Sequence, residues 1–430
     1  MRELNVGKGT FLTFGGRSFN FLLAFVAGIV IARTTGPQGK GIYSLVLLTA
    51  GLGAMLTGIG VGTSNACFAG RKPDKIKSLA TNSILLTIIS SILLGTLFLI
   101  LQGAQVFEPA KLKYIGIALV IIPFILQFSL FNDILHGMNK IPEFNLVRVA
   151  APFLQVVILC ILLKVLNLKL ALIIWAISQI ISTILAILIV FKNTGGLGPI
   201  DLSLFRKSLI FGVQVWIAQL VGMLNLRVDM YLVAYYLTPQ DVGYYSIAVG
   251  LAEFLWFLPS SIAITLLPMF THIDAKNAQN LACKGLRLSL FSGALLLIIL
   301  LSAGRFVVPA LYGKAFIGAV LPLSILLPGV AFYGMAHITS AYFNGHIGKP
   351  IINTGLAAIS LIINIVLNII LIPKIGVNGA ALSSTIAYIL AMGVCIYMFI
   401  RLSGTPVKDM LIVRKDDFRS CLQIFRGIKS

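Results

Sequence analysis

One short stretch of sequence occurs twice and decides the fold. The first copy reads Gly36-Pro37-Gln38-Gly39-Lys40-Gly41-Ile42-Tyr43-Ser44, and the second, 202 positions later, reads Thr238-Pro239-Gln240-Asp241-Val242-Gly243-Tyr244-Tyr245-Ser246. Pro, Gln, Gly, Tyr and Ser coincide in the two copies. In each copy the proline ends one apolar helix, and the glycine begins the next helix after a tight turn. The pattern predicts a repeated unit that opens with two helices joined by this turn.

Two weaker internal similarities occur at nearly the same spacing. Residues 137–142 resemble residues 345–350 at a shift of 208, and Lys164 corresponds to Lys374 at a shift of 210. Three matches in the same order are difficult to attribute to chance. They indicate that a unit of six helices is duplicated in the same orientation.

The composition places these helices in a membrane. Hydrophobic residues make up 58% of the 430 residues and charged residues only 11%, whereas a soluble domain carries about 25% charged residues. A membrane-spanning helix needs ~20 apolar residues. Division of the chain at charged, glycine and proline clusters predicts twelve such spans, at 11–33, 41–69, 79–101, 114–135, 149–166, 170–191, 208–236, 243–270, 288–310, 317–343, 351–372 and 379–400.

The basic residues predict the orientation of the spans. One alternating set of connectors holds 22 Lys and Arg, and the opposite set holds 9. Short loops rich in Lys and Arg remain cytoplasmic, so both termini are expected inside the cell. The net charge of +20 is spread over these connectors instead of forming one basic face. We therefore expect no nucleic acid as a partner.

The repeat also predicts the domain organisation. We expect an all-α polytopic membrane protein with an N-terminal lobe at 1–200, a C-terminal lobe at 201–402 and a cytoplasmic basic tail at 403–430. Transporters rock two such pseudo-symmetric lobes around a central cavity near the membrane midplane. The Gly/Pro-rich connector at 192–207 is where a hinge between the lobes is expected. The tail pattern suits either a helix on the anionic inner surface or a solvated segment.

At this point the motifs resemble a known family. They are Ala32-Arg33 with Gly36-Pro37-x-x-x-Gly41-x-Tyr43-Ser44, Arg227-x-Asp229 with Gly243-x-Tyr245-Ser246-x-Ala248, and Ile372-Pro373-x-x-Gly376-x-x-Gly379-Ala380-Ala381. The chain resembles polysaccharide-biosynthesis membrane proteins. These are the O-antigen-type oligosaccharide-lipid flippases of the multidrug/oligosaccharidyl-lipid/polysaccharide exporter superfamily, whose fold is MATE-like.

The resemblance implies a function and partners. A flippase of this family would carry polyprenyl-diphosphate-linked oligosaccharide across the cytoplasmic membrane by ion-coupled alternating access. Its expected partners are this lipid-linked substrate and membrane lipids, with a polysaccharide polymerase and glycosyltransferases as further candidates. We expect no cofactor other than a coupling Na⁺ or H⁺. The sugar and the oligomeric state are left open by the sequence.

Arg17 and Asn20 are the first candidate substrate-binding residues. An ionisable group inside a span costs ~3 kcal/mol on insertion scales, which makes it a candidate for function. Arg17 lies about two turns into the first span and shares a helical face with Asn20. Its guanidinium matches the geometry of phosphate oxygens, so it could hold the diphosphate headgroup. The alternative is an arginine that extends to the phospholipid headgroups of the bilayer.

The seventh and eighth spans supply the other candidates. Arg227 and Asp229 are two positions apart, about 200° around a helix, and so cannot pair directly. Arg227 is expected to face substrate, whereas Asn225 and Asp229 share a face that could bind Na⁺ or a proton. Glu253 could line the cavity and pair with Arg227, or simply pack against a neighbouring helix.

Two other function classes compete with the flippase. A multidrug exporter of the same superfamily would be expected to carry excess carboxylates for cationic drugs, but here two intramembrane acids balance two arginines. A membrane-embedded glycosyl transferase or polymerase needs acid/base groups in a sizeable outer loop, and the predicted outer loops are short. We therefore expect no enzyme activity. The five cysteines lack metal-ligand spacing, so no metal site is expected either.

Overall fold

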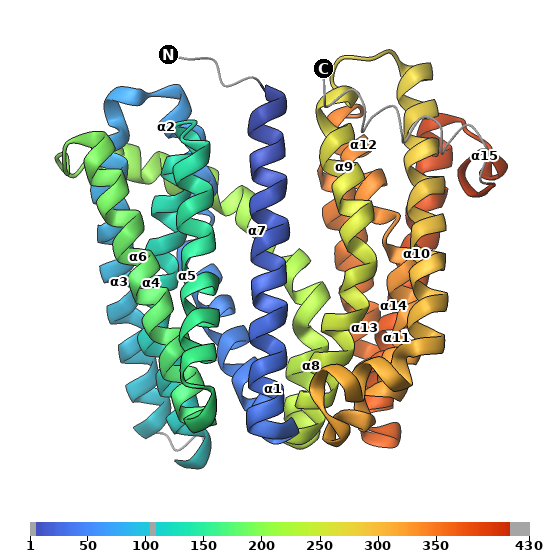
Figure 1. Cartoon of the computed structure of the whole chain (residues 1–430). Coiled ribbons are helices and arrows are strands. Elements are labelled where there is room, and N and C mark those ends of the chain that lie inside the picture. Colours follow the sequence, from blue (N-terminus) through green and yellow to red (C-terminus); the bar gives the residue numbers. More distant parts are fainter. Residues whose placement is uncertain (1–5, 104–108, 413–430) are drawn as a thin grey trace. The chain divides into compact units, whose positions relative to one another are not determined.

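The computed structural model describes residues 6–103 and 109–412. All regular structure in these residues is helical (Figure 1). The α-helices are α1 (Val6–Gly58), α2 (Val61–Arg71), α3 (Ile76–Gly103), α4 (Pro109–Gly137), α5 (Ile141–Ile161), α6 (Leu168–Thr194), α7 (Leu202–Tyr236), α8 (Pro239–Ala252), α9 (Phe257–Phe270), α10 (Ala275–Tyr312), α11 (Val320–Tyr333), α12 (Ala336–Gly345), α13 (Ile351–Ile375), α14 (Val377–Ser403) and α15 (Val407–Leu411).

The helices confirm the predicted number of membrane crossings. Eleven helical segments among the described residues are long and apolar enough to span a membrane, and the first, Gly15–Gly58, has 44 residues. At ~1.5 Å per residue that segment is about twice as long as the ~30 Å hydrocarbon layer. It is also interrupted at Gly36, where the backbone is not helical. The first segment therefore counts as two spans and the total is twelve.

Both copies of the repeated motif form the turn between two spans. In the first copy Gly36 has φ 68°, and Pro37 follows at the start of the next helical segment. In the second copy Thr238 is the N-cap of α8, with Pro239 in its first turn. The Thr238 amide donates to the Asp241 carboxylate over 3.1 Å, and the Asp241 amide donates to the Thr238 hydroxyl over 3.4 Å. This capping box fixes the start of the eighth span.

The chain divides into two compact units, the described parts of residues 1–220 and 221–430. Unit 1 contains the first six spans and the beginning of α7, and its apolar core includes Ile31, Phe131 and Trp175. Unit 2 contains the rest of α7 and the last five spans, with a core that includes Phe270 and Phe343. The division falls inside α7, whereas the sequence places the lobe boundary at residue 200.

The second span of each unit is broken. In unit 1, α1 ends at Gly58 and α2 starts at Val61, with Ile59 at φ 44° and Gly60 at φ 68° between them. A positive φ is uncommon for a residue with a branched side chain. In unit 2, the 3₁₀ turn Glu253–Trp256 separates α8 from α9. Breaks of this kind within spans occur where the backbone lines a cavity or contacts other protein segments.

The connector before α7 is bound to α3. The Gly198 amide donates to the Lys77 carbonyl over 3.3 Å, and Thr81 donates its hydroxyl proton to the Gly198 carbonyl over 2.8 Å. Asn82 and Asp201 exchange two hydrogen bonds, and Lys75 Nζ lies 3.2 Å from Asp201 Oδ2. This connector was predicted to be a hinge, and in the structure these bonds attach it to residues 75–82 of its own unit.

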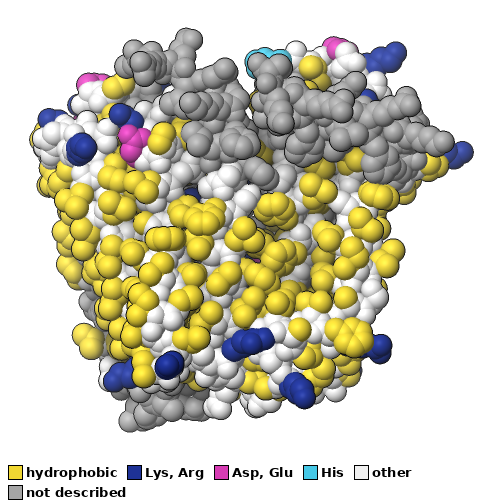
Figure 2. Space-filling view, in the orientation of Figure 1, with side chains coloured by type: hydrophobic (Ala, Val, Ile, Leu, Met, Phe, Trp, Pro, Cys, Tyr) yellow, Lys and Arg dark blue, Asp and Glu magenta, His cyan; other side chains and the backbone are white. Residues whose placement is uncertain are grey.

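The surface matches a membrane environment. On the face in Figure 2, hydrophobic side chains cover the middle of the helices, whereas Lys and Arg side chains lie toward their ends.

At the end of the described chain, Met410 of α15 is fully buried, and buried Arg287 on α10 donates a hydrogen bond to the Asp409 carbonyl. Most of the predicted amphipathic tail, residues 413–430, lies outside the described residues.

Candidate substrate and coupling sites

Arg227 on α7 forms an ion pair inside unit 2. Its Nη1 lies 2.6 Å from Glu253 Oε1, and its Nη2 donates to Glu253 Oε2 over 3.2 Å. Both side chains are partly exposed, 31% for Arg227 and 21% for Glu253. Glu253 opens the 3₁₀ turn that breaks the eighth span, so this break presents the carboxylate to α7. Of the two alternatives for Glu253, the structure shows pairing.

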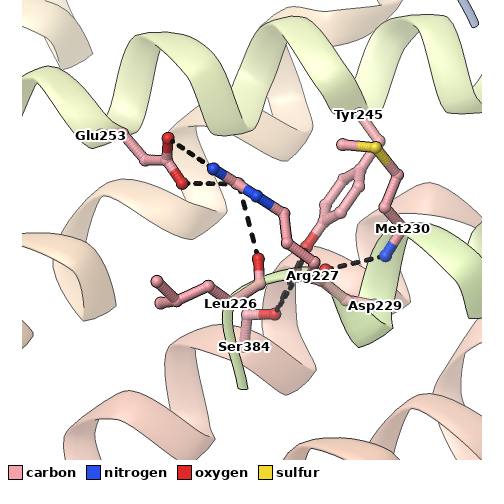
Figure 3. A network of polar contacts seen from close by, with 7 residues as sticks. All are labelled: Leu226, Arg227, Asp229, Met230, Tyr245, Glu253 and Ser384. Atoms are coloured by element: carbon pink, nitrogen blue, oxygen red, sulfur yellow. Dashed lines mark hydrogen bonds and ion pairs between the residues drawn. The ribbon is translucent and has the colours of Figure 1, made fainter. Parts of the chain in front are cut away.

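Asp229 faces a different, fully buried set of partners (Figure 3). Its Oδ2 accepts hydrogen bonds from the Tyr245 hydroxyl at 2.5 Å and from the Ser384 hydroxyl at 3.0 Å. Its Oδ1 accepts from the Met230 amide at 2.7 Å. Arg227 and Asp229 therefore have separate partners, as their two-residue spacing requires.

The Asp229 network continues into α13. Asn364 donates from Nδ2 to the Ser384 hydroxyl over 2.9 Å, and Asn368 donates to Asn364 Oδ1 over 2.8 Å. The side chains of Asn364, Asn368 and Ser384 are fully buried. Asn368 Oδ1 is also buried, and no hydrogen-bond donor reaches it among the described residues. We call Asp229, Tyr245, Ser384, Asn364 and Asn368 the unit 2 polar network.

Asn225 lies apart from this network. Its Nδ2 donates to the Tyr333 hydroxyl over 3.2 Å, and Tyr333 stacks on Tyr388 at a centroid distance of 4.6 Å. The ring of Trp256 contacts both tyrosines. The sequence groups Asn225 with Asp229, but no hydrogen bond links the two in the structure.

Arg17 lies in unit 1 beside a second arginine. Its side chain on α1 is exposed and acts electrostatically on Arg148 of α5 and His136 at the end of α4. Within residues 6–103 and 109–412, no carboxylate forms an ion pair with either guanidinium. Asn20, predicted to share this face, is half-buried. Asp133 of α4 also acts electrostatically on Arg148, so the two arginines and this one carboxylate leave a net positive charge inside the first unit.

Three residues of these candidate sites were not predicted from the sequence. Arg148 was assigned to the cytoplasmic connector 136–148, although α5 begins at Ile141. Tyr245 belongs to the repeated motif, where it was interpreted only as part of a turn. Ser384 carries no local signal, because α14 contains several small polar residues. The Asn364–Asn368 pair is visible in the sequence as an i, i+4 spacing, but its partner is not.

The fold has close counterparts among solved membrane transporters. The inward closed form of lipid II flippase MurJ is similar with a TM-score of 0.77 and 19% identity, over 96% of this chain and 91% of that one. An inward-facing MATE multidrug resistance transporter of the MOP superfamily gives a TM-score of 0.72 at 14% identity, over 90% and 94% of the two chains. The protein therefore has the exporter-type, all-α polytopic fold of this superfamily.

The sequence comparison identifies the family. Residues 6–274 match the polysaccharide biosynthesis protein family, and the chain belongs to it. An uncharacterised membrane protein of Methanocaldococcus jannaschii is 24% identical over 273 residues, which are 60% of this chain. The match spans 54% of that relative's length. The resemblance found in the sequence motifs is confirmed.

Proposed function

We propose that the protein is a flippase that carries polyprenyl-diphosphate-linked oligosaccharide across the cytoplasmic membrane. The observation that carries this proposal is that Arg17 on α1 and Arg148 on α5 lie in membrane-spanning helices of unit 1, near enough for Arg17 to act electrostatically on Arg148. Each guanidinium lies in a membrane-spanning helix, where a charge costs ~3 kcal/mol on insertion scales. Two such charges repel each other unless an anion lies between them.

A diphosphate is the anion that suits this site. A guanidinium binds two phosphate oxygens at once with charge-assisted hydrogen bonds. A diphosphate offers oxygens on two adjacent phosphoryl groups, one for each arginine. Asn20, on the predicted face of Arg17, adds an amide that can donate to an ester or sugar oxygen. Arg227, in contrast, is occupied by Glu253, and an anion would have to replace that carboxylate.

Ion coupling is the second part of the proposal, and the unit 2 polar network supports it. Asp229 is a buried carboxylate whose hydrogen-bond donors are neutral hydroxyl and amide groups. Hard cations prefer oxygen ligands, and the buried Asn368 Oδ1 has no donor among the described residues. A Na⁺ ion or a proton would neutralise Asp229 and couple its occupancy to the transport cycle. Asn225 is not needed for this step.

The family also supports the cellular setting. We propose that the chain lies in the cytoplasmic membrane with both termini inside, next to the glycosyltransferases that build its substrate and the polymerase that consumes it. Transport does not require bond making or breaking by the protein. The flippase is accordingly proposed to have no enzyme activity.

The test is glycan-lipid transport by purified protein in liposomes. With a fluorescent polyprenyl-diphosphate oligosaccharide, Arg17→Ala and Arg148→Ala should each lower the transport rate by about 10- to 100-fold, because a charge-assisted contact contributes ~1.5–3 kcal/mol. Arg17→Lys should retain part of the rate. Arg401→Ala is the matched control, since Arg401 lies against Tyr397 at the end of α14.

The same liposomes separate the flippase from a multidrug exporter. Wild-type rates for Arg17→Ala and Arg148→Ala would contradict the headgroup role. Uptake of a fluorescent organic cation with no movement of the glycan-lipid would support the exporter. The ion pair between Glu253 and Arg227 supports the flippase, because it leaves the Glu253 carboxylate without a free charge for a cationic drug.

A further inference from the structure

Unit 1 contains a cavity that the proposed headgroup site does not use. Its volume is about 230 Å³, and it lies between α1, α2, α4 and the middle of α7. Its polar lining comes from Thr63, Ser129, Asp133 and Gln219, and its apolar lining includes Met55 and Leu126. The remaining lining residues are Gly51, Ala54, Gly58, Gly60, Gly62, Ile125 and Leu130.

The break in the second span opens this cavity. Ile59 and Gly60 take up positive φ there, and the backbone changes direction between α1 and α2. Gly212 of α7 packs directly on the break, since a Cβ on Gly212 would lie 2.5 Å from the Ile59 carbonyl oxygen. A Cβ on Gly62 would lie 2.2 Å from Asp133 Oδ2. The absence of a side chain at Gly62 therefore makes room for the Asp133 carboxylate.

The polar groups of the cavity are free to bind a ligand. Gln219 donates from Nε2 to the Thr63 hydroxyl over 3.2 Å, which leaves its carbonyl oxygen available. Asp133 is half-buried on α4. Among the described residues it forms no hydrogen bond or ion pair. A carboxylate, a carboxamide and two hydroxyl groups thus line one small chamber.

The charge of the surroundings selects the ligand class. Arg148 acts electrostatically on Asp133, and Arg17 acts on Arg148. The nearby arginines disfavour a free cation at Asp133, while the carboxylate itself disfavours an anion. A neutral ligand with several hydroxyl groups satisfies both conditions, because it can donate to the carboxylate and also accept from Gln219 and Thr63.

The volume of the cavity also favours a small neutral ligand. A water molecule occupies ~30 Å³, and pockets for drug-sized ligands begin at ~300 Å³. A cavity of about 230 Å³ is too large for a bare ion and too small for an oligosaccharide. It suits one sugar ring or several water molecules.

We propose that this cavity binds one sugar residue of the transported glycan, with Asp133 accepting hydrogen bonds from its hydroxyl groups. The choice of a sugar rests on the proposed flippase function, whereas the cavity and its free carboxylate do not. Arg148 acts on both Arg17 and Asp133, so the diphosphate site and the cavity are neighbours within one unit. This arrangement fits the diphosphate and a sugar close to it in one glycan-lipid.

The experiment measures binding of free sugars to the purified full-length protein in lipid nanodiscs. N-acetylglucosamine, glucose and galactose are titrated separately by calorimetry up to tens of millimolar. At least one sugar should bind the wild type, and Asp133→Asn should weaken it by about tenfold or more, as expected for loss of a charge-assisted hydrogen bond. Gly51→Leu, which places a side chain where no atom lies within 4 Å of the added Cβ, should abolish binding.

Two controls make the result specific. Gly95→Leu makes the same change at an exposed glycine of α3 whose added Cβ also meets no atom within 4 Å, and it should bind sugar like the wild type. Arg401→Ala should also retain free-sugar binding, because Arg401 lies against Tyr397 at the end of α14 and not at the cavity. Together they show that loss of binding reflects the cavity and not general damage to the fold.

Several results would overturn the sugar site. One is that none of the three sugars binds the wild type. Another is that a sugar binds the wild type, Asp133→Asn and Gly51→Leu equally. A third is that the wild type binds Na⁺ in place of sugar and that Asp133→Asn removes this Na⁺ binding. Failure of the flippase proposal gives a different result, namely sugar binding without glycan-lipid transport. Conversely, normal glycan-lipid transport by Gly51→Leu would contradict the sugar site and leave the flippase intact.

Discussion

Arg227 and Asp229 show how two residues of one helix turn can have separate tasks. The Arg227 guanidinium reaches the Glu253 carboxylate, and Asp229 points the other way to Tyr245 and Ser384. Arg227 thus forms an ion pair with an acid, whereas the hydrogen bonds to Asp229 come from neutral donors and Arg227 acts on it only at a distance. A buried carboxylate without a positive partner is costly, and a cation or proton removes that cost. This difference is the reason why we propose Asp229 as the coupling residue.

Asp229→Asn tests the coupling role at the scale of one residue. The amide oxygen can still accept from Tyr245, so the fold should persist, but the negative charge that attracts a cation is lost. Glycan-lipid transport in liposomes should become independent of an imposed Na⁺ or pH gradient and fall at least tenfold, the factor that ~1.4 kcal/mol represents. Rates are measured with and without each gradient.

A matched carboxylate provides the control for this variant. Asp274→Asn makes the same chemical change at the exposed N-cap of α10 and should keep the gradient dependence of the wild type. If Asp229→Asn responds to the gradients as the wild type does, Asp229 is not the coupling residue. The arginine pair would then have to act without an ion site in this network.

The residues of the site were predictable only in part. Arg17, Arg227, Asp229 and Glu253 are visible because charges interrupt apolar runs, and that signal is local. Their partners are not local, since Ser384 is 155 positions from Asp229. Hydropathy does not distinguish a buried serine that bonds a carboxylate from one that bonds its own helix. The pairing of Arg227 with Glu253 remained one of two alternatives for the same reason.

At the scale of elements, hydrogen bonds and an ion pair attach the connector between α6 and α7 to its neighbouring helices. Asp201 caps α7 by accepting from the Leu204 amide over 2.9 Å, and it pairs with Lys75 near the start of α3. The Leu204 amide and then the Lys75 ammonium hold the pKa of Asp201 below its usual value. A carboxyl group with a lowered pKa in the folded state stabilises that state above the unfolded pKa of ~3.9. The contribution is lost as the pH falls through the folded pKa.

Hydrogen exchange of residues 195–204 can detect this contribution. Asp201→Asn keeps a capping oxygen but removes the charge, so at pH 7 the segment should exchange faster than in the wild type. The difference should shrink below pH 4 and vanish once the wild-type carboxyl is protonated. The loop at Asp274 in the same samples is the internal control. Equal exchange of the two proteins at pH 7 would show that the ion pair contributes nothing to the attachment.

The element boundaries show where sequence reasoning succeeds and fails. The twelve spans were predicted because each depends on the hydropathy of its own residues. The breaks at Ile59 and at Glu253 were not. Gly58 and Gly60 flank the first break, but glycines occur throughout these apolar runs, and glutamate carries no helix-ending signal. Both breaks depend on tertiary contacts, such as the close packing of Gly212 on Ile59. The hinge expected at 192–207 was inferred from glycine and proline content, which does not reveal the bonds to α3.

At the scale of the whole chain, the two copies of the repeat share the arrangement of their helices but differ in the polar groups that they bury. Tyr43 and Tyr245 correspond at a shift of 202, and both are buried with bonded hydroxyl groups, one to Gln155 and the other to Asp229. At the same shift Asp229 corresponds to Ala27. Of the two corresponding positions on the first helix of the repeat, only the one in unit 2 has a buried carboxylate, so the proposed coupling site and the two arginines lie in different units.

The orientation of the whole chain follows from its basic residues and can be tested directly. The asymmetry of 22 against 9 Lys and Arg between the two sets of connectors predicts that the turn at 237–242 is outside and the loop at 271–287 inside. Gln240→Cys and Lys276→Cys place thiols at exposed positions in these two segments. On intact cells, a membrane-impermeant maleimide should label Gln240→Cys more strongly than it labels the unchanged protein, which already holds five cysteines. It should label Lys276→Cys more strongly only after permeabilisation. The opposite pattern would reverse the direction of transport, because the arginine pair would then face the outer leaflet, where the glycan-lipid is delivered.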